Sequence, residues 1–232
     1  LLVVGGRGSG KSEQLASIVL SLAATQAPEH LHLVVWGESF THLNRLPHVA
    51  SSANRIDDAT VGVFLDGVER ELARRERMRT LDHGDREGNP LANVPRLVIV
   101  IDDVDTIMRV VPVASERLVR LYRRCRGLGV HVVWSASRHN GGVIADLVDL
   151  STIRIVLRVA SGPDSTDLIG SDAASRLERS LPGRGYVVSG RNEPKEVQGG
   201  AVSIGTPRPS EELEVAPFTL VTGRAQFADG VL

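Results

Sequence analysis

The first twelve residues constrain the fold of this chain most strongly, because they join an apolar strand to a glycine-rich loop and a helix. Residues 1–4 are apolar, residues 5–12 follow the pattern G-x-x-x-x-G-K-S, and a helical pattern begins near Glu13. In that context the pattern is typical of a phosphate-binding loop, whose main-chain N–H groups point inward while the helix N-terminus adds a positive dipole end. A glycine-rich turn without a ligand is the alternative. We expect phosphate contacts from the loop residues Gly5, Gly8, Ser9, Gly10, Lys11 and Ser12.

Two side chains of the loop and one later acidic pair predict the kind of ligand. Lys11 is placed to reach the β- and γ-phosphates of a nucleoside triphosphate, and the Ser12 hydroxyl to hold Mg²⁺. The apolar run 96–101 ends in Asp102 and Asp103. Ligands lie at the carboxyl edge of the strands in open α/β sheets. We therefore expect Asp102 to bind Mg²⁺ through water and Asp103 to orient or deprotonate the attacking water.

The residues around this acidic pair leave alternatives open. An aspartate at a strand end can simply cap the following turn, and Asp105 is a weaker candidate for the base. Asp103 is one methylene shorter than glutamate, so its carboxylate would fall about 1 Å short of the water. The apolar run 130–135 leads to Ser137 and Arg138, which are candidates for contact with the γ-phosphate. The alternative for Arg138 is an ordinary loop arginine in solvent.

Apolar runs alternate with helical stretches, which predicts an α/β fold with a mostly parallel sheet and helices on both faces. We expect strands at 1–4, 31–36, 96–101, 130–135, 153–159 and 185–189, and helices at 13–25, 59–81, 113–126 and 142–147. The 232 residues suit one such domain. Because 205–212 reads as an extended linker, we expect the domain at 1–204 and a linker or lead into a following domain at 205–232.

Composition narrows the classes of partner. The formal net charge is −1, which excludes a bulk basic field for nucleic acid but not a local basic patch. The single cysteine, Cys125, excludes an internal disulfide, and we interpret it as a packed small residue. No apolar stretch approaches the ~20 residues that cross a bilayer. Because the chain begins with Leu1 inside a strand, we expect a piece of a longer protein, with any membrane anchor outside it.

Charged residues crowd the helix expected at 59–81. Glu71 and Arg75 form an attractive i,i+4 pair, whereas Arg70 and Arg74 repel each other. We assign most of these charges to a solvated helix face, and a functional arginine on this helix is the alternative.

With these segments identified, the chain resembles the FtsK/SpoIIIE branch of RecA-like motor ATPases over most of 1–204. It is most similar to the ATPase modules of type VII secretion motors, the EccC group of actinobacteria. Besides the loop and acidic pair, the resemblance rests on LPHV at 46–49, LGVH at 128–131, SASR at 135–138 and LPGRGY at 181–186. It implies a RecA-like fold, ATP and Mg²⁺ as cofactors, and a module within a multi-ATPase chain at the cytoplasmic face of a membrane. Secreted proteins are the implied substrates, and DNA is the substrate in the translocase relatives.

The resemblance also implies an arginine that completes the ATP site of a neighbouring module. The candidates are Arg154, Arg158 and the helix arginines near Arg74. Two departures from the family pattern point to weak turnover. The run VVWGES at 34–39 stands where active relatives usually carry aspartate or lysine followed by Gly-Gly. Asp102-Asp103 replaces the usual Asp-Glu pair.

Three functions therefore stay open at this point. The first is an ATP-binding export motor module with weak or partner-dependent ATPase activity. The second is a DNA translocase motor, which the net charge disfavours. The third is a non-hydrolysing nucleotide-binding platform that docks peptides or neighbouring modules. The altered acidic pair Asp102-Asp103 and the segment around Trp36 support the third function, but we interpret Trp36 and Trp134 as core or sheet-edge residues rather than docking sites.

Overall fold

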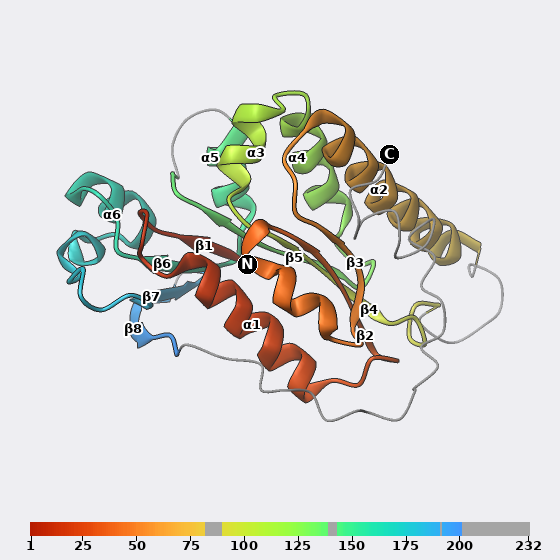
Figure 1. Ribbon diagram of the computed structural model, residues 1–232, viewed down its shortest axis with the longest axis horizontal. Coiled ribbons are helices and arrows are strands. Elements are labelled where there is room, and N and C mark those ends of the chain that lie inside the picture. Colours follow the sequence, from red (N-terminus) through yellow and green to blue (C-terminus); the bar gives the residue numbers. More distant parts are fainter. Residues whose placement is uncertain (82–89, 139–142, 191, 201–232) are drawn as a thin grey trace.

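The computed structural model describes residues 1–81, 90–138, 143–190 and 192–200, and its centre is an eight-stranded sheet (Figure 1). The strand order is β3-β2-β4-β5-β1-β6-β7-β8. Strands β1 to β6 run parallel, whereas β7 pairs antiparallel with β6 and with β8. The strands are β1 (Leu2–Val4), β2 (Leu31–Trp36), β3 (Val49–Ala53), β4 (Arg96–Ile101), β5 (Val130–Ala136), β6 (Ile153–Leu157), β7 (Arg184–Ser189) and β8 (Lys195–Gln198).

Helices cover both faces of this sheet, as the alternating pattern predicts (Figure 1). The α-helices are α1 (Lys11–Thr25), α2 (Asp58–Leu81), α3 (Val104–Val110), α4 (Ala114–Arg124), α5 (Val143–Leu150) and α6 (Gly162–Ile169), with 3₁₀ turns η1 (Glu38–Arg45) and η2 (Ala173–Arg176). Alternate strand residues point to opposite faces. Thus Val98 and Val100 of β4 share a core with α1 and η1, whereas Ile99 shares one with α2, α3 and α4. The expected α/β fold is confirmed.

The structure also contains elements that the sequence pattern did not predict. β3 is rich in small residues and β8 is polar, and both are edge strands, so neither shows the continuous apolar run of a central parallel strand. α6 carried ordinary helix signals that were overlooked: Ser161 caps its N-terminus, and Gly170 ends it in the left-handed conformation. The expected boundary after 204 and the expected helix start at Gly142 lie outside the described residues.

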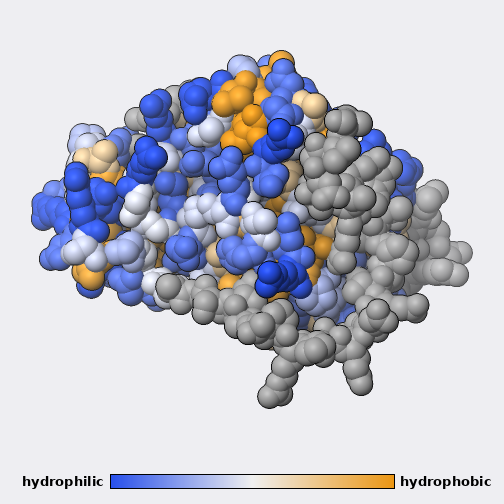
Figure 2. Space-filling view, viewed as in Figure 1, coloured by the Kyte–Doolittle hydropathy of each residue, from blue (hydrophilic) through white to orange (hydrophobic). Residues whose placement is uncertain are grey.

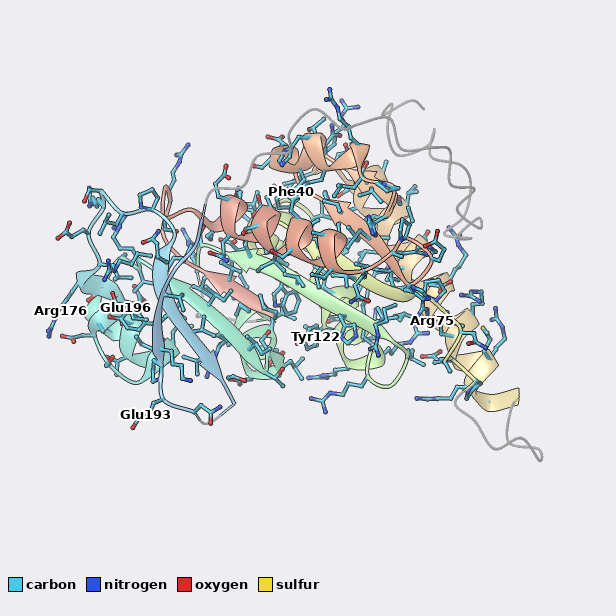
Figure 3. All side chains as sticks on the ribbon, turned by 90° about the horizontal axis from the view of Figure 1, so that it is seen from below. Phe40, Arg75, Tyr122, Arg176, Glu193 and Glu196 are labelled. Carbon is cyan, nitrogen blue, oxygen red and sulfur yellow. The ribbon has the colours of Figure 1, made fainter. Side chains whose placement is uncertain are left out.

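The expected solvated face of α2 is wrong for its central charges. Glu71 and Arg75 are buried and joined at 2.6 Å. Arg75 also donates to the main-chain oxygens of Pro95, Leu128 and Gly129, so it joins α2 to the segments that precede β4 and β5 (Figure 3). Burial lowers the pKa of Arg75, and the hydrogen bond from its guanidinium to Glu71 opposes that shift.

Other α2 charges pair with the neighbouring helix α4. Arg117 donates to Glu69 and Asp66, and Arg124 donates to both carboxylate oxygens of Glu76. These bonds raise the pKa values of both arginines. The charges of α2 therefore act mainly within the domain, against a helix that lies about fifty residues further along the chain.

The expectations for the cysteine and the tryptophans are confirmed. Cys125 is buried, and burial raises the pKa of its thiol to about 12. Trp36 and Trp134 are each 1% exposed. Trp36 packs on Phe64, and Trp134 stacks on Tyr122 with ring centroids 4.8 Å apart. Both indoles are therefore core residues and offer no docking surface.

The surface carries mixed polar side chains and small separate apolar patches (Figure 2). The larger exposed apolar residues include Val110 and Val113, on either side of the turn from α3 to α4. Such scattered apolar side chains are normal on protein surfaces. Within residues 1–81, 90–138, 143–190 and 192–200, every helix is too short or too polar to cross a bilayer.

Candidate nucleotide-binding site

The glycine-rich loop joins β1 to α1 with a tight main-chain path. A Cβ at Gly5 would overlap the Ser9 hydroxyl and lie 2.9 Å from the Leu157 Cβ. Gly10 has φ +97° at the N-cap of α1, and a Cβ there would lie 2.8 Å from the main-chain nitrogen of Gly183. Close approach at Gly5, and backbone conformation with close approach at Gly10, therefore require glycine in the predicted motif.

Lys11 lies at the first position of α1 and points back over the loop. Its Nζ donates to the main-chain oxygens of Gly5 at 2.9 Å and Gly6 at 3.3 Å. These bonds hold the ammonium beside the loop, where a phosphate group would complete its donor capacity. Lys11 thus has the placement that the motif predicts.

Asp102 is fixed from three sides at the carboxyl end of β4. It is 8% exposed, and its Oδ2 accepts from the Ser12 hydroxyl at 2.7 Å. Its Oδ1 accepts from the Ser135 hydroxyl, and Gly37 packs so closely that a Cβ would lie 2.8 Å from the Asp102 Cβ. The structure therefore brings Ser12 and Asp102, predicted from two distant motifs, into direct contact.

Ser135 is a site residue that sequence reasoning missed. It is fully buried at the end of β5, donates to Asp102, and accepts from the main-chain N–H of Asp103 at 2.9 Å. One hydroxyl thus orients both acids of the pair. The available signal was a polar residue near the end of an otherwise apolar strand, whereas the sequence pattern alone favoured the later Ser137 and Arg138.

Asp103 has a strained main chain and a side chain near Ser137. Its φ of +53° makes it the one non-glycine residue in the left-handed region among those described. The Ser137 hydroxyl donates to its Oδ1 at 3.3 Å. Asp105, the weaker candidate for the base, instead accepts from the main-chain N–H of Ser137 at 3.1 Å. Strained residues of this kind concentrate at functional sites.

A cleft of about 1210 Å³ opens above these residues. Its walls are residues of the loop, α3, the segment after β5, α5 and the segment from β6 to α6: Gly6, Arg7, Gly8, Gly10, Lys11, Ser12, Glu13, Asp103, Asp105, Thr106, Arg109, Ser137, Arg138, Ile144, Val159, Ala160 and Asp164. Arg138 therefore shares the cleft with Lys11 and Asp103, as expected. Arg109 and Asp164 also line it, although nothing in the sequence pattern singled them out.

The arginines proposed to act on a neighbouring module are not among the residues that line the cleft. Arg154 pairs with Leu2 near the start of β6, away from the carboxyl edge that holds the cleft. Arg158 follows β6, and its main-chain oxygen accepts from the N–H of Gly6 at 2.8 Å. Arg74 is bound to Glu71, and Arg75 is buried and cannot reach a neighbour.

The donor set of the site fits a nucleotide with a divalent cation. A hydroxyl and a carboxylate oxygen lie 2.7 Å apart at Ser12 and Asp102, and Mg²⁺ takes such oxygen ligands together with phosphates and water. The Lys11 ammonium and the first turn of α1 place positive charge beside them. The positive groups suit the phosphates and the Asp102 carboxylate suits the cation that accompanies them.

Comparison with known proteins agrees with this geometry. Residues 1–210 match the FtsK/SpoIIIE family. The chain belongs to this family. The resemblance seen in the sequence is therefore confirmed, and nucleotide binding through the loop is a property of the family's fold.

The relatives of this FtsK/SpoIIIE domain include proteins of type VII secretion systems. The ESX secretion system protein EccC of Thermomonospora curvata is 32% identical over 202 residues, which cover 80% of this chain and 15% of the relative. ESX-4 secretion system protein EccC4 of Mycobacterium tuberculosis is 29% identical over 93% of this chain and 19% of its own length. The chain thus spans less than a fifth of these curated relatives.

Solved structures support the same fold. The cytoplasmic domain of the T. curvata type VII secretion ATPase EccC superposes with a TM-score of 0.77 at 30% identity, over 90% of this chain and 26% of that one. ATPases 2 and 3 of T. curvata EccC in complex with a signal sequence peptide superpose with a TM-score of 0.69 at 23% identity, over 87% of this chain and 39% of that one. The RecA-like P-loop fold expected from the resemblance is confirmed.

Proposed function

We propose that this domain is an ATP-binding motor module of a type VII secretion ATPase, which uses ATP binding and hydrolysis to drive protein export. The observation that carries the proposal is the hydrogen bond between Ser12 and Asp102, with Lys11 beside it in the same cleft. That contact joins the phosphate-binding loop to the acidic pair, as a metal–nucleotide site requires. The relatives supply the type of motor.

Each residue has a distinct role in this proposal. The loop N–H groups and Lys11 bind the phosphates, while Ser12 and Asp102 hold Mg²⁺, Asp102 through water. The bound cation neutralises charge that develops on the β- and γ-phosphates during hydrolysis. Ser135 keeps the carboxylate of Asp102 aimed at the Ser12 hydroxyl.

Asp103 is the proposed base for the attacking water, and Arg138 the proposed contact for the γ-phosphate. Asp103 accepts from Ser137 and lies in the cleft with Arg138. Because aspartate is shorter than glutamate, a small misplacement of the carboxylate reduces the rate. We therefore propose weak or partner-dependent hydrolysis, in which a neighbouring module supplies an arginine to this site. Arg154 or Arg158 of this chain would serve the site of a neighbouring module in the same way.

The proposed setting is a chain of several ATPase modules at the cytoplasmic face of the cell membrane, with any membrane contact made by other parts of that chain. The small share of the relatives that this chain spans supports a single module. Neighbouring modules and secreted proteins are the proposed partners. One similar structure, of T. curvata EccC, was solved with a signal sequence peptide. Nothing in the described residues favours the DNA translocase or the docking platform, and Trp36 and Trp134 are buried.

Calorimetry with ATP and Mg²⁺, together with single-turnover hydrolysis on the same sample, tests the nucleotide part of this proposal. Lys11 and Lys195 are the two lysines of the chain, and Lys195 is exposed on β8. Lys11→Ala should abolish ATP binding or weaken it by about 100-fold or more, while the matched control Lys195→Ala should bind ATP as the wild type does. Equal affinity in both variants would contradict the site. For the export part, Lys11→Ala in the full-length protein should stop secretion by the cells that produce it.

A further inference from the structure

The phosphate-binding loop is hydrogen-bonded to a hairpin that lies far away in the sequence. The main-chain N–H of Gly183, just before β7, donates to the main-chain oxygen of Ser9 at 2.8 Å. The N–H of Gly199, just after β8, donates to the oxygen of Gly183 at 2.8 Å. A chain of main-chain hydrogen bonds thus runs from the end of β8 to the loop (Figure 3, where Glu196 marks β8).

These three segments approach too closely for side chains. A Cβ at Gly10 would lie 2.8 Å from the Gly183 nitrogen, and a Cβ at Gly183 would lie 3.0 Å from the Gly199 oxygen. Gly183 also has φ +83°, which disfavours any other residue. The Gln198 amide fixes the contact further by donating to the oxygens of Pro182 at 3.0 Å and Gly199 at 3.1 Å.

The hydrogen bond from Gly183 sets the direction of a loop amide. The oxygen of Ser9 and the N–H of Gly10 belong to one peptide group, which is planar and trans. Because the Ser9 oxygen points at Gly183, the Gly10 N–H points the opposite way, away from the hairpin. Gly10 lines the cleft with Lys11 and Ser12, so this N–H is one of those available to a phosphate.

We infer that Gly183 is a positioning residue that orients the Gly10 amide for phosphate binding, and that the end of β8 sets nucleotide affinity through Gly199. This inference rests on the proposed nucleotide function. A displaced β8 would pull on Gly183 and turn the Ser9–Gly10 peptide. By reciprocity, a bound nucleotide would hold the end of β8 in place. The mobility of the β7–β8 hairpin should therefore depend on whether a nucleotide is bound at the phosphate-binding loop.

Gly183→Ala tests the inference, because the new Cβ must push Gly199 away while the residue keeps an unfavourable φ. We expect ATP affinity to fall about tenfold or more, within the usual range of such coupling. The matched control is Gly170→Ala: Gly170 has φ +76°, and nothing in the described chain lies within 4 Å of its Cβ position. The control carries the same backbone strain and should keep wild-type affinity. Equal affinities of Gly183→Ala, Gly170→Ala and the wild type would overturn the inference.

A second variant covers the case in which Gly183→Ala does not fold. Gln198→Ala removes two hydrogen bonds of the contact without adding an atom, and affinity should fall several-fold. Its control, Glu196→Ala, removes the exposed ion pair with Arg184 on the same hairpin and should not change affinity. Affinity unchanged in Gln198→Ala would count against the inference.

Amide hydrogen exchange separates this inference from the proposed function. Without nucleotide, the Gly183 amide should exchange faster in Gln198→Ala than in the wild type or in Glu196→Ala. With ATP, the Gly183 and Gly199 amides of the wild type should exchange more slowly. A wild type that binds no ATP would refute the proposed function, whereas the nucleotide-free exchange rates still test the contact. Wild-type exchange at Gly183 in Gln198→Ala would refute the inference even if ATP binds.

Discussion

Two groups of charged residues in this domain look alike in the sequence but have different roles in the structure. Glu71 and Arg75 are buried, and Arg75 is bound to Glu71 and to the oxygens of Pro95, Leu128 and Gly129. Lys11 and Asp102 instead lie at an open cleft of about 1210 Å³ or directly beneath it. Glu71 and Arg75 form their hydrogen bonds with other groups of the protein. Lys11 and Asp102 still have donor or acceptor positions that a ligand could occupy.

The difference shows that charge in a sequence does not reveal its purpose. Both groups include a basic and an acidic residue, and both join segments that are distant along the chain. Burying an ion pair is tolerated only when its remaining donors and acceptors are satisfied. The buried group meets that condition through main-chain oxygens, so we expect it to govern stability, and the cleft group to govern nucleotide binding.

The largest expected effect is the loss of the buried group. Arg75→Ala leaves the Glu71 carboxylate buried without this partner, and removes the guanidinium donor from the main-chain oxygens of Pro95 and Leu128. The free energy of unfolding should fall by about 3–5 kcal/mol, as measured by urea denaturation. Arg124→Ala removes a half-exposed ion pair with Glu76 and should cost about 1 kcal/mol or less. Similar losses of stability for Arg75→Ala and Arg124→Ala would mean that the buried group is not what stabilises the domain.

Lys11→Ala should weaken ATP binding and leave the stability of the domain nearly unchanged, the opposite of what we expect for Arg75→Ala. It removes the ammonium that contacts the loop oxygens of Gly5 and Gly6, and ATP affinity should fall by about 100-fold or more. The urea midpoint should stay near that of the wild type, because the side chain is not part of the core. Calorimetry and urea denaturation on the same preparation check both statements. A large loss of stability would place Lys11 with the structural group.

Ser135→Ala should affect both properties. It removes the donor to Asp102 and leaves the buried N–H of Asp103 without its acceptor. The cost in stability should be about 1–3 kcal/mol, and turnover should fall about tenfold or more as the acids lose their orientation. Ser151→Ala is the matched control, since Ser151 is also buried and bonded to the Trp134 indole away from the cleft. It should cost stability while turnover per folded molecule stays constant.

Asp103→Glu sharpens the assignment of the base. If the short carboxylate limits hydrolysis, the longer side chain should raise single-turnover rates. The left-handed main chain at this position should cost glutamate about 1 kcal/mol relative to aspartate, which urea denaturation would detect. A rate that does not rise would move the limiting step elsewhere, to an arginine supplied by a neighbouring module.

The smallest effect concerns pH. Burial raises the pKa of the Cys125 thiol from 9.0 to about 12, so the folded chain keeps a proton that the unfolded chain loses above about pH 9. Stability from this group is therefore complete below about pH 9 and falls as pH rises toward 12. Unfolding measured at pH 8 and pH 10 should show a larger alkaline loss in the wild type than in Cys125→Ala. Equal losses would mean that the thiol is not held neutral by burial.

The local parts of the site were predictable from sequence, because they depend on residues that are neighbours in the chain. The loop glycines, Lys11 and the strand that ends in Asp102 all follow from short patterns. The strands at 31–36 and 96–101 have the observed bounds, since buried parallel strands are continuous apolar runs. The edge strands and short helices were missed because they are too short, or too poor in large apolar residues, to carry a clear periodic pattern.

By itself, then, the sequence determined the strand–loop–helix typical of a phosphate-binding site, the parallel centre of the sheet and the position of the acidic pair at the end of its strand. Only the tertiary structure decided that Ser135 is bonded to both acids, that Glu71 and Arg75 are buried, and that the Gly183 N–H donates to the Ser9 oxygen. The physical reason is the separation along the chain of the residues that interact. Periodicity and turn chemistry act over a few residues, whereas these contacts join segments brought together only when the whole sheet forms.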